Sequence, residues 1–300
     1  MLRKLISQTL DRMPYVSGLR ERVRDVGEFP AGHFHSPIPT RADVGALVQA
    51  CPRPGGEIPG IDLKADAQRE LLQKWRAFYG ALPFPEESTP ECRYYFRQTV
   101  FCYADAIFLY SFLRDVQPRR IIEVGSGFSS AVMLDTVDRF FDHRPQITLI
   151  EPFPINLRKL LRPQDYKGLT LIEDKVQHVP VDTFASLQSG DLLFIDSSHV
   201  LKYGSDLQFL MFEVLPRLPV GVFVHFHDVF DCFEYPRDWL LKGWYWNEDY
   251  ALRAFLSYNN SWEICLFGNY AVGAFSDFFR EQMPLCLKNP GGSLYIRRTA

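Results

Sequence analysis

Four side chains that follow two apolar segments could do acid–base or metal chemistry. Asp196 and His199 lie three residues apart in "FIDSSHV", and His227 and Asp228 end "VFVHFHD". In one interpretation a divalent cation binds Asp196 and Asp228, with or without His227, and lowers the pKa of a substrate hydroxyl. His199 then removes the proton, because the pKa of histidine lies near neutral pH. In the other interpretation no metal binds, and a histidine alone is the base.

A glycine-containing turn lies upstream, in "RRIIEVGSGFSS". Gly125 and Gly127 follow an apolar run directly, and glycines there let the backbone turn tightly and approach a ligand. The dinucleotide motif G-x-G-x-x-G is incomplete, because Ser130 occupies its third glycine position. Glu123 would repel a pyrophosphate but can pair with an ammonium group. The turn therefore favours a ligand that carries an amino acid and a ribose over a dinucleotide.

Two further acids follow the next two apolar runs. Glu151 comes directly after "QITLI", where a carboxylate can accept both ribose hydroxyls. Asp174 ends "LTLIED" and could meet the adenine side of the same ligand. The simpler alternative is that Glu123, Glu151 and Asp174 each cap a following helix.

The elements that must position these residues alternate between strand and helix. We predict strands at 120–125, 146–151, 169–174, 191–198 and 221–228, late strands at 261–268 and 293–298, and helices at 130–141, 155–161 and about 203–217. Near-continuous apolar strands that alternate with helices are typical of a parallel sheet covered on both faces. The fold class is therefore α/β, a Rossmann-like, seven-stranded and mostly parallel sheet with an N-terminal helical and loop extension.

The division into domains follows from a change in character near residue 115. Residues 28–60 are rich in proline and glycine, and helices are predicted at about 64–80 and 100–115. We assign 1–115 to a helix-and-loop extension that caps the active site, and 116–300 to the ligand-binding domain.

Composition excludes several classes of partner. The chain has 300 residues and a net charge of −3, which argues against a nucleic acid held by bulk electrostatics. No run reaches the roughly 18 apolar residues of a membrane span. The 6 cysteines form no C-x-x-C pair, and no signal peptide is apparent, so we expect reduced thiols in a cytoplasmic protein.

The ordered motifs "RRIIEVGSGFSS", "ITLIEPFP", "DLLFIDSSHV" and "VHFHDVF" resemble class I S-adenosylmethionine-dependent methyltransferases. The likeness is greatest to a branch of small-molecule and sugar O-methyltransferases with largely uncharacterised bacterial members. It implies methyl transfer from S-adenosylmethionine to a hydroxyl of a small molecule. It also implies that Gly125 and Gly127 back the methionine part of the cofactor, that Glu123 faces its ammonium group, and that Glu151 holds the ribose. Further cofactor contacts are expected at Ser126, Asp174 and Asp196.

The same resemblance bears on the metal. Metal-dependent sugar methyltransferases of this type have an aspartate with a histidine three residues later, which Asp196 and His199 match. They also have two adjacent acids after the fifth strand, where this chain has His227 and Asp228. An imidazole suits magnesium less well, because hard cations prefer oxygen. Two carboxylates with one imidazole would also suit manganese, iron or zinc.

Aromatic and histidine side chains elsewhere are candidates for substrate contact. Tyr235 and Trp246 belong to the aromatic segment 229–250 and could stack on a ring or a sugar face. Equally, that segment could be buried against the N-terminal helices or in a homodimer interface. By resemblance, the loop that carries His33 and His35 folds over the site. His225 is deeper on its strand and is expected to be structural.

Three rival functions share this fold. A nicotinamide oxidoreductase is disfavoured by Glu123 and by the missing third glycine. A hydroxylase-like protein that keeps the cofactor but does different chemistry is a second rival. The third is a non-catalytic pathway protein, which would have no need for both Asp196 and His199.

Overall fold

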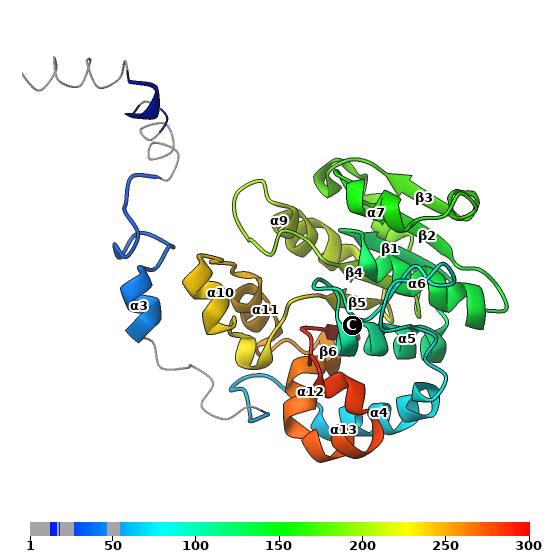
Figure 1. Ribbon diagram of the computed structural model, residues 1–300. Coiled ribbons are helices and arrows are strands. Elements are labelled where there is room, and N and C mark those ends of the chain that lie inside the picture. Colours follow the sequence, from blue (N-terminus) through cyan, green and yellow to red (C-terminus); the bar gives the residue numbers. More distant parts are fainter. Residues whose placement is uncertain (1–12, 17, 19–26, 47–54) are drawn as a thin grey trace, which may run out of the picture. The chain divides into compact units, whose positions relative to one another are not determined.

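The structure is a computed structural model that describes residues 13–16, 18, 27–46 and 55–300. The chain forms two compact units, one of Met1–Gln49 with Pro236–Tyr245 and one of Ala50–Tyr235 with Trp246–Ala300. The first unit contains α3 (Arg41–Ala46) and α10 (Arg237–Lys242), joined by a hydrogen bond from Arg237 Nη2 to Gly45 O of 3.0 Å. The second unit contains the sheet (Figure 1).

The second unit is built on seven strands in the order β3-β2-β1-β4-β5-β7-β6. Neighbours among β1 to β5 pair in parallel, and β7 is antiparallel to both β5 and β6. The seven-stranded, mostly parallel sheet predicted from the sequence is confirmed. The strands are β1 (Arg120–Val124), β2 (Gln146–Ile150), β3 (Leu169–Ile172), β4 (Leu192–Ile195), β5 (Phe223–Phe226), β6 (Trp262–Phe267) and β7 (Leu294–Arg298).

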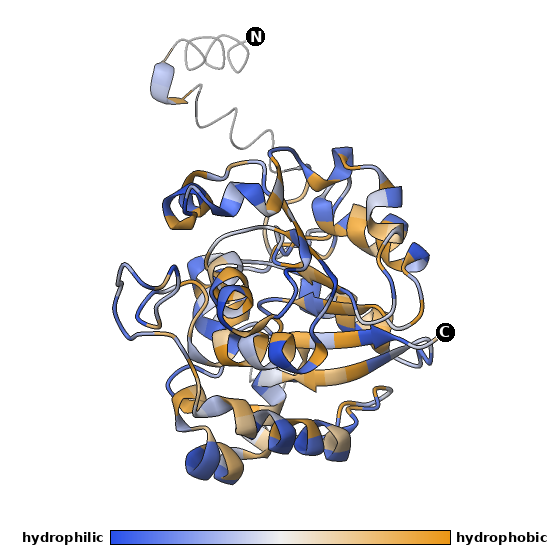
Figure 2. Ribbon diagram, turned by 90° about the vertical axis from the view of Figure 1, so that its right-hand side faces the viewer, coloured by the Kyte–Doolittle hydropathy of each residue, from blue (hydrophilic) through white to orange (hydrophobic). Residues whose placement is uncertain are grey.

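The central strands are apolar because the sheet is covered on both faces. All four residues of β4 are buried, as are the last four of β1, and the strands are mostly hydrophobic in Figure 2. The strand order reverses between β1 and β4, which are hydrogen-bonded neighbours. Ligands of open α/β sheets bind outside the carboxyl ends of the strands at such a switch point. The motifs at the ends of β1, β4 and β5 therefore meet at one edge.

Two helices that begin before residue 116 belong to the same compact unit as the sheet. They are α4 (Ala65–Tyr79) and α5 (Tyr103–Val116), close to their predicted bounds. Residues Ala104 to Leu113 of α5 are all buried, as its apolar sequence predicts. This helix packs against α4 and against α6 (Phe128–Phe140), which follows the glycine turn.

The single helix predicted at about 203–217 is divided into three parts. They are α9 (Asp206–Phe209), a π-helical turn η3 (Leu210–Val214) and a 3₁₀ turn η4 (Leu215–Arg217). Pro216 has no N–H to donate, so an α-helix cannot continue regularly through it. The remaining helical elements are α7 (Ile155–Leu160), η1 (Asp165–Lys167), η2 (Val176–His178), α8 (Val181–Ala185), η5 (Asp231–Phe233), α11 (Glu248–Leu256), α12 (Gly268–Ala274), α13 (Ser276–Gln282) and η6 (Pro284–Leu287).

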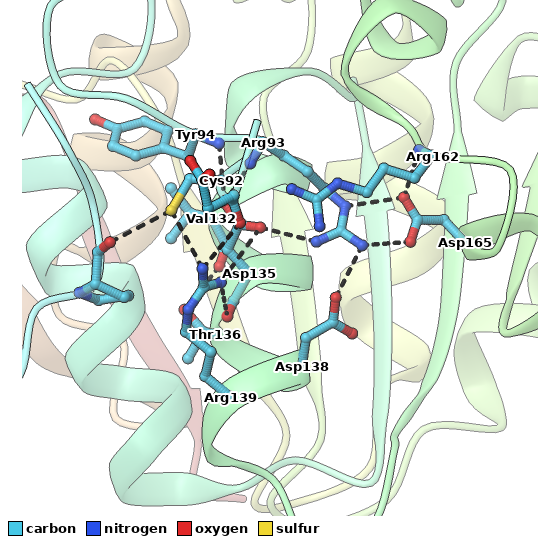
Figure 3. Close-up of polar contacts among 12 residues, drawn as sticks. Cys92, Arg93, Tyr94, Val132, Asp135, Thr136, Asp138, Arg139, Arg162 and Asp165 are labelled. Atoms are coloured by element: carbon cyan, nitrogen blue, oxygen red, sulfur yellow. Dashed lines mark hydrogen bonds and ion pairs between the residues drawn. The ribbon is translucent and has the colours of Figure 1, made fainter. Parts of the chain in front are cut away.

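A buried arginine ties the loop before α5 to α6 and η1 (Figure 3). The guanidinium of Arg93 donates to Asp135 Oδ1 at 2.8 Å and to Asp165 Oδ2 at 2.9 Å, and it pairs with Asp138 Oδ2 at 2.8 Å. Asp135 also accepts the backbone N–H groups of Arg93 and Tyr94, at 2.7 and 2.9 Å. The side chains of Arg93, Asp135 and Asp165 are at most 1% exposed. We call these four side chains, Arg93, Asp135, Asp138 and Asp165, the Arg93 cluster.

One prediction about the cysteines is wrong. Cys232 forms a disulfide bond, whereas the sequence predicts reduced thiols throughout. Cys92, Cys102, Cys265 and Cys286 are free thiols. Within the described ranges, the structure contains no helix with the length and apolar character needed to cross a bilayer.

Candidate active site

The turn between β1 and α6 is closed on one side and open on the other. Gly125 has φ +78°, and an added Cβ would lie 1.7 Å from the backbone oxygen of Asp196. Only glycine fits this close approach. A Cβ on Gly127 would meet no described atom within 4 Å. The buried hydroxyl of Ser126 has no hydrogen-bond partner among the described residues.

Glu123 lies beneath this turn and is 0% exposed. Its carboxyl group accepts a hydrogen bond from Ser129 Oγ at 2.6 Å and another from Ser130 Oγ, both in the first turn of α6. Burial raises the pKa of Glu123 to about 8. Glu123 therefore carries a proton at neutral pH and anchors the start of α6. Its expected contact with an ammonium group stays a prediction.

Glu151 and Asp174 occupy different environments at the same edge. Glu151 accepts the backbone N–H of Ser126 at 3.2 Å and that of Phe153 at 2.8 Å, one on each oxygen. Each oxygen keeps a lone pair for another donor. Asp174 is turned toward its own loop, where it accepts the Lys175 N–H at 2.7 Å and contacts His178 Nδ1 at 2.8 Å. The hydrogen bond with His178 lowers the pKa of Asp174.

The structure brings Asp196, His199, His227 and Asp228 together. His199 Nε2 lies 3.5 Å from Asp196 Oδ1 and 3.6 Å from Asp228 Oδ2. His227 Nδ1 lies 3.4 Å from Asp196 Oδ1 and 3.8 Å from Asp228 Oδ1. These four side chains, here the acid–histidine cluster, come from the ends of β4 and β5, which pair in parallel. Parallel pairing explains their convergence, because it aligns the carboxyl ends of both strands.

Backbone strain marks two members of this cluster. His199 and Asp228 both have φ +58°, in the left-handed region of backbone conformation that residues other than glycine rarely adopt. Such conformations persist where surrounding contacts hold them, and they gather at functional sites.

Charge is shared unevenly within the cluster. Burial by itself would lower the pKa of His227, but the carboxylates of Asp228 and Asp196 raise it well above its usual value. Burial would raise the pKa of Asp196, but His227 holds it below the ordinary value. Asp228 has a raised pKa because it is buried. The attraction between His227 and its neighbouring carboxylates therefore raises the pKa of the imidazole and lowers the pKa of Asp196.

Two acids in the site are absent from the sequence predictions. Asp105 on α5 lies with its Oδ2 3.5 Å from His227 Nε2, and Glu248 at the start of α11 lies with its Oε2 2.7 Å from His199 Nδ1. A lone acid in the apolar helix "YADAIFLYSFL" is a signal that could have revealed Asp105. Glu248 carries no such signal, because acids are common in the first turn of any helix.

The aromatic candidates for substrate contact lie beside the cluster. The ring of Trp246 is centred 4.4 Å from that of His199, and Tyr235 meets Trp246 edge-on at 5.9 Å. Tyr235 is buried, and its hydroxyl accepts the Asp249 N–H at 3.3 Å.

The remaining histidine candidates have local partners. His225 is fully buried and stacks on Phe194 at 3.9 Å, and neither ring nitrogen has a hydrogen-bond partner among the described residues, so its structural role stays a prediction. His33 and His35 belong to the first compact unit and form a local group with Phe29 and Phe34. Their substrate role stays a prediction.

Comparison with known proteins identifies the family. A family model described as a methyltransferase domain matches residues 122–229, from β1 to the loop after β5. An uncharacterized protein of Archaeoglobus fulgidus is 35% identical over 196 residues, which are 63% of this chain and 84% of that protein. The chain belongs to the class I S-adenosylmethionine-dependent methyltransferases.

Solved structures similar to this methyltransferase include two with a cofactor or its product bound. One is a Podospora anserina methyltransferase with S-adenosylhomocysteine, 17% identical, with a TM-score of 0.43 and coverage of 78% of this chain and 88% of that one. The other is a Streptomyces achromogenes O-methyltransferase of tomaymycin synthesis with S-adenosylmethionine, 15% identical, with a TM-score of 0.40 and coverage of 78% and 90%.

Proposed function

We propose that this methyltransferase transfers a methyl group from S-adenosylmethionine to a hydroxyl of a small molecule of the sugar or natural-product type. The observation that carries this proposal is the acid–histidine cluster beside the glycine turn. The oxygen attacks the methyl carbon, the bond from that carbon to sulfur breaks, S-adenosylhomocysteine leaves, and the hydroxyl proton passes to His199. The protein contributes mainly by holding the two reactants in line.

The cofactor is proposed to lie across the glycine turn. Gly125, Ser126 and Gly127 would contact its methionine part, Glu123 would face its ammonium group, and Asp196 would lie near the sulfonium. Glu151 would accept the ribose hydroxyls with its two free lone pairs, and Asp174 would border the adenine side. The unpartnered Ser126 hydroxyl supports this proposal, because buried polar groups normally find a partner.

Replacing Glu151 with alanine should weaken S-adenosylhomocysteine binding more than tenfold. The variant loses two acceptors for the ribose hydroxyls and also the anchor of the Ser126 N–H. Calorimetric titration measures the effect, and Glu173→Ala is a suitable control because Glu173 is a half-exposed partner of Arg158. Unchanged affinity would remove Glu151 from the ribose site.

The proposal includes a divalent cation beside the substrate hydroxyl. The described residues contain no group of three or more histidine, cysteine or acidic side chains arranged to hold an ion. The donor chemistry of Asp196, Asp228 and His227 would nonetheless suit manganese or iron as well as magnesium. Both ring nitrogens of His227 are buried without a hydrogen bond to a described residue. An ion held by these side chains would polarise the substrate hydroxyl.

Chelation followed by dialysis should therefore lower turnover, and added Mg²⁺, Mn²⁺ or Fe²⁺ should restore it. Elemental measurement of the metal content of the untreated protein identifies the ion. Full turnover in protein shown to be free of metal would leave the histidine as sole base.

Titration with S-adenosylhomocysteine, followed by a methyl-transfer screen against hydroxylated small molecules, tests the main proposal. Binding with turnover of a hydroxyl acceptor supports it. Binding with no transfer to any acceptor would favour the hydroxylase-like or the non-catalytic alternative.

Three further predictions concern the surroundings of the enzyme. A cytoplasmic location stays a prediction, and the disulfide at Cys232 counts against it, because disulfides persist in oxidising compartments. The aromatic segment 229–250 is proposed to form the interface of a homodimer, and light scattering at several protein concentrations tests this oligomeric state. We likewise propose that the N-terminal extension 1–115 caps the active site.

A further inference from the structure

We infer that Glu248 positions His199 and fixes its tautomer, so that Nε2 is the nitrogen that takes the proton. This inference rests on the proposed function, because it names the residue that prepares the proposed base. Glu248 has no place in the sequence motifs and reaches the site from α11, 49 residues further along the chain.

The contact between the side chains of Glu248 and His199 is short and buried. Glu248 Oε2 lies 2.7 Å from His199 Nδ1, with the histidine side chain 7% and the glutamate side chain 1% exposed. The other oxygen, Oε1, is buried and has no hydrogen-bond partner among the described residues. Among the described residues, His199 is therefore the only hydrogen-bond partner of the Glu248 carboxylate.

The backbone reinforces this contact. The N–H groups of Asn247 and Glu248 both donate to the carbonyl oxygen of His199, at 3.1 and 3.2 Å. The side chain of Asn247 brackets Leu201, accepting its N–H at 2.6 Å and donating to its carbonyl oxygen at 3.1 Å. The start of α11 therefore holds the loop after β4 at several points. This support explains how His199 keeps its left-handed backbone conformation.

The tautomer follows from the donor and acceptor chemistry. Carboxylates lie at both ring nitrogens and only accept hydrogen bonds, but Nδ1 lies 2.7 Å from Glu248, whereas Nε2 lies 3.5 and 3.6 Å from Asp196 and Asp228, beyond a good hydrogen bond; the hydrogen of the neutral ring therefore lies on Nδ1. The lone pair is then on Nε2, which faces Asp196 Oδ1 and Asp228 Oδ2. A hydrogen bond to one ring nitrogen sets which nitrogen carries the hydrogen. For metal-bound histidines the loss of such a carboxylate costs about 10- to 100-fold in metal affinity or activity, and we expect a loss of the same size here.

The test compares Glu248→Met with Glu248→Gln. Methionine keeps much of the volume but removes the acceptor, whereas glutamine keeps an acceptor oxygen. In ¹⁵N-histidine NMR spectra, recorded at a pH where the ring is neutral, wild type and Glu248→Gln should show His199 with hydrogen on Nδ1. Glu248→Met should lose this preference, and its kcat should fall about 10- to 100-fold while KM and S-adenosylhomocysteine affinity stay within about twofold.

A matched control is Asp249→Asn, since Asp249 is the buried neighbour of Glu248 and its carboxyl group contacts Phe230 instead of His199. This variant should keep the wild-type tautomer and kcat. Hydrogen on Nε2 in wild type would overturn the inference, as would an unchanged tautomer and kcat in Glu248→Met. If Glu248→Met does not fold, the tautomer of His199 in the wild-type protein still tests the inference. Absence of methyl transfer by wild type would count against the proposed function, and the NMR result does not depend on it.

Discussion

Replacing His199 with alanine should lower kcat about 10²- to 10⁴-fold, the range that a positioned general base contributes. The proposed base faces two carboxylates with Nε2 and is held by Glu248 through Nδ1. Alanine removes the proton acceptor but leaves the glycine turn and Glu151 in place. Cofactor affinity should therefore change little while the chemical step slows.

The pH dependence of the rate gives a second readout. Burial by itself would lower the pKa of His199, but Glu248, Asp196 and Asp228 raise it above the usual value. A base works only when it is unprotonated, so kcat/KM should rise as pH increases through this raised pKa. The His199→Ala variant should lose that rise.

The control for this experiment is His143→Ala, because His143 is exposed on the loop before β2. It should keep the wild-type kcat and pH profile. A kcat for His199→Ala within about threefold of wild type would rule out His199 as the base. Steady-state kinetics with calorimetric titration of S-adenosylhomocysteine separates the chemical step from binding.

Replacing Arg93 with alanine should lower the free energy of unfolding by about 3–5 kcal/mol, the usual cost of breaking a buried ion pair. Without the guanidinium, Asp135 and Asp165 would be buried carboxylates without their cation, and Asp138 would lose a partner. The loop before α5 would also lose its attachment to η1. Urea unfolding followed by fluorescence or circular dichroism measures this change.

A nearby arginine provides the comparison. Arg97 pairs with Glu87 at 2.7 Å, but both side chains are about two-thirds exposed, at 65% and 66%. Exposed pairs contribute little, so Arg97→Ala should stay within about 0.5 kcal/mol of wild type. A loss below about 1 kcal/mol for Arg93→Ala would mean that the Arg93 cluster adapts or admits water.

The local hydrophobic pattern of the sequence is sufficient to predict the sheet and to predict that the motifs at the strand ends lie close together. Apolar runs such as "LLFI" in β4 predict buried parallel strands, and parallel pairing then brings Asp196 next to His227 and Asp228. The glycine turn is likewise readable, because Gly125 follows a strand directly and is required by the nearby Asp196 oxygen.

The partners of these residues could not be predicted, because they come from distant elements. Glu248 and Asp105 reach the histidines from α11 and α5, and no spacing in the sequence relates them to His199 or His227. The environment of Glu123 also depends on tertiary structure. The hydrogen bonds that its carboxyl oxygens accept from Ser129 and Ser130 of α6 could not be read from its position before the turn.

The burial of Glu123 couples folding to proton uptake. Its pKa is raised from 4.5 to about 8 by burial, against the opposing hydrogen bonds of Ser129 and Ser130. Between these two values the folded chain holds a proton that the unfolded chain releases. The contribution of this residue to stability is therefore fully present below about pH 4.5 and is lost as pH rises through about 8. Each molecule that folds near neutral pH removes a proton from solution at the base of its glycine turn.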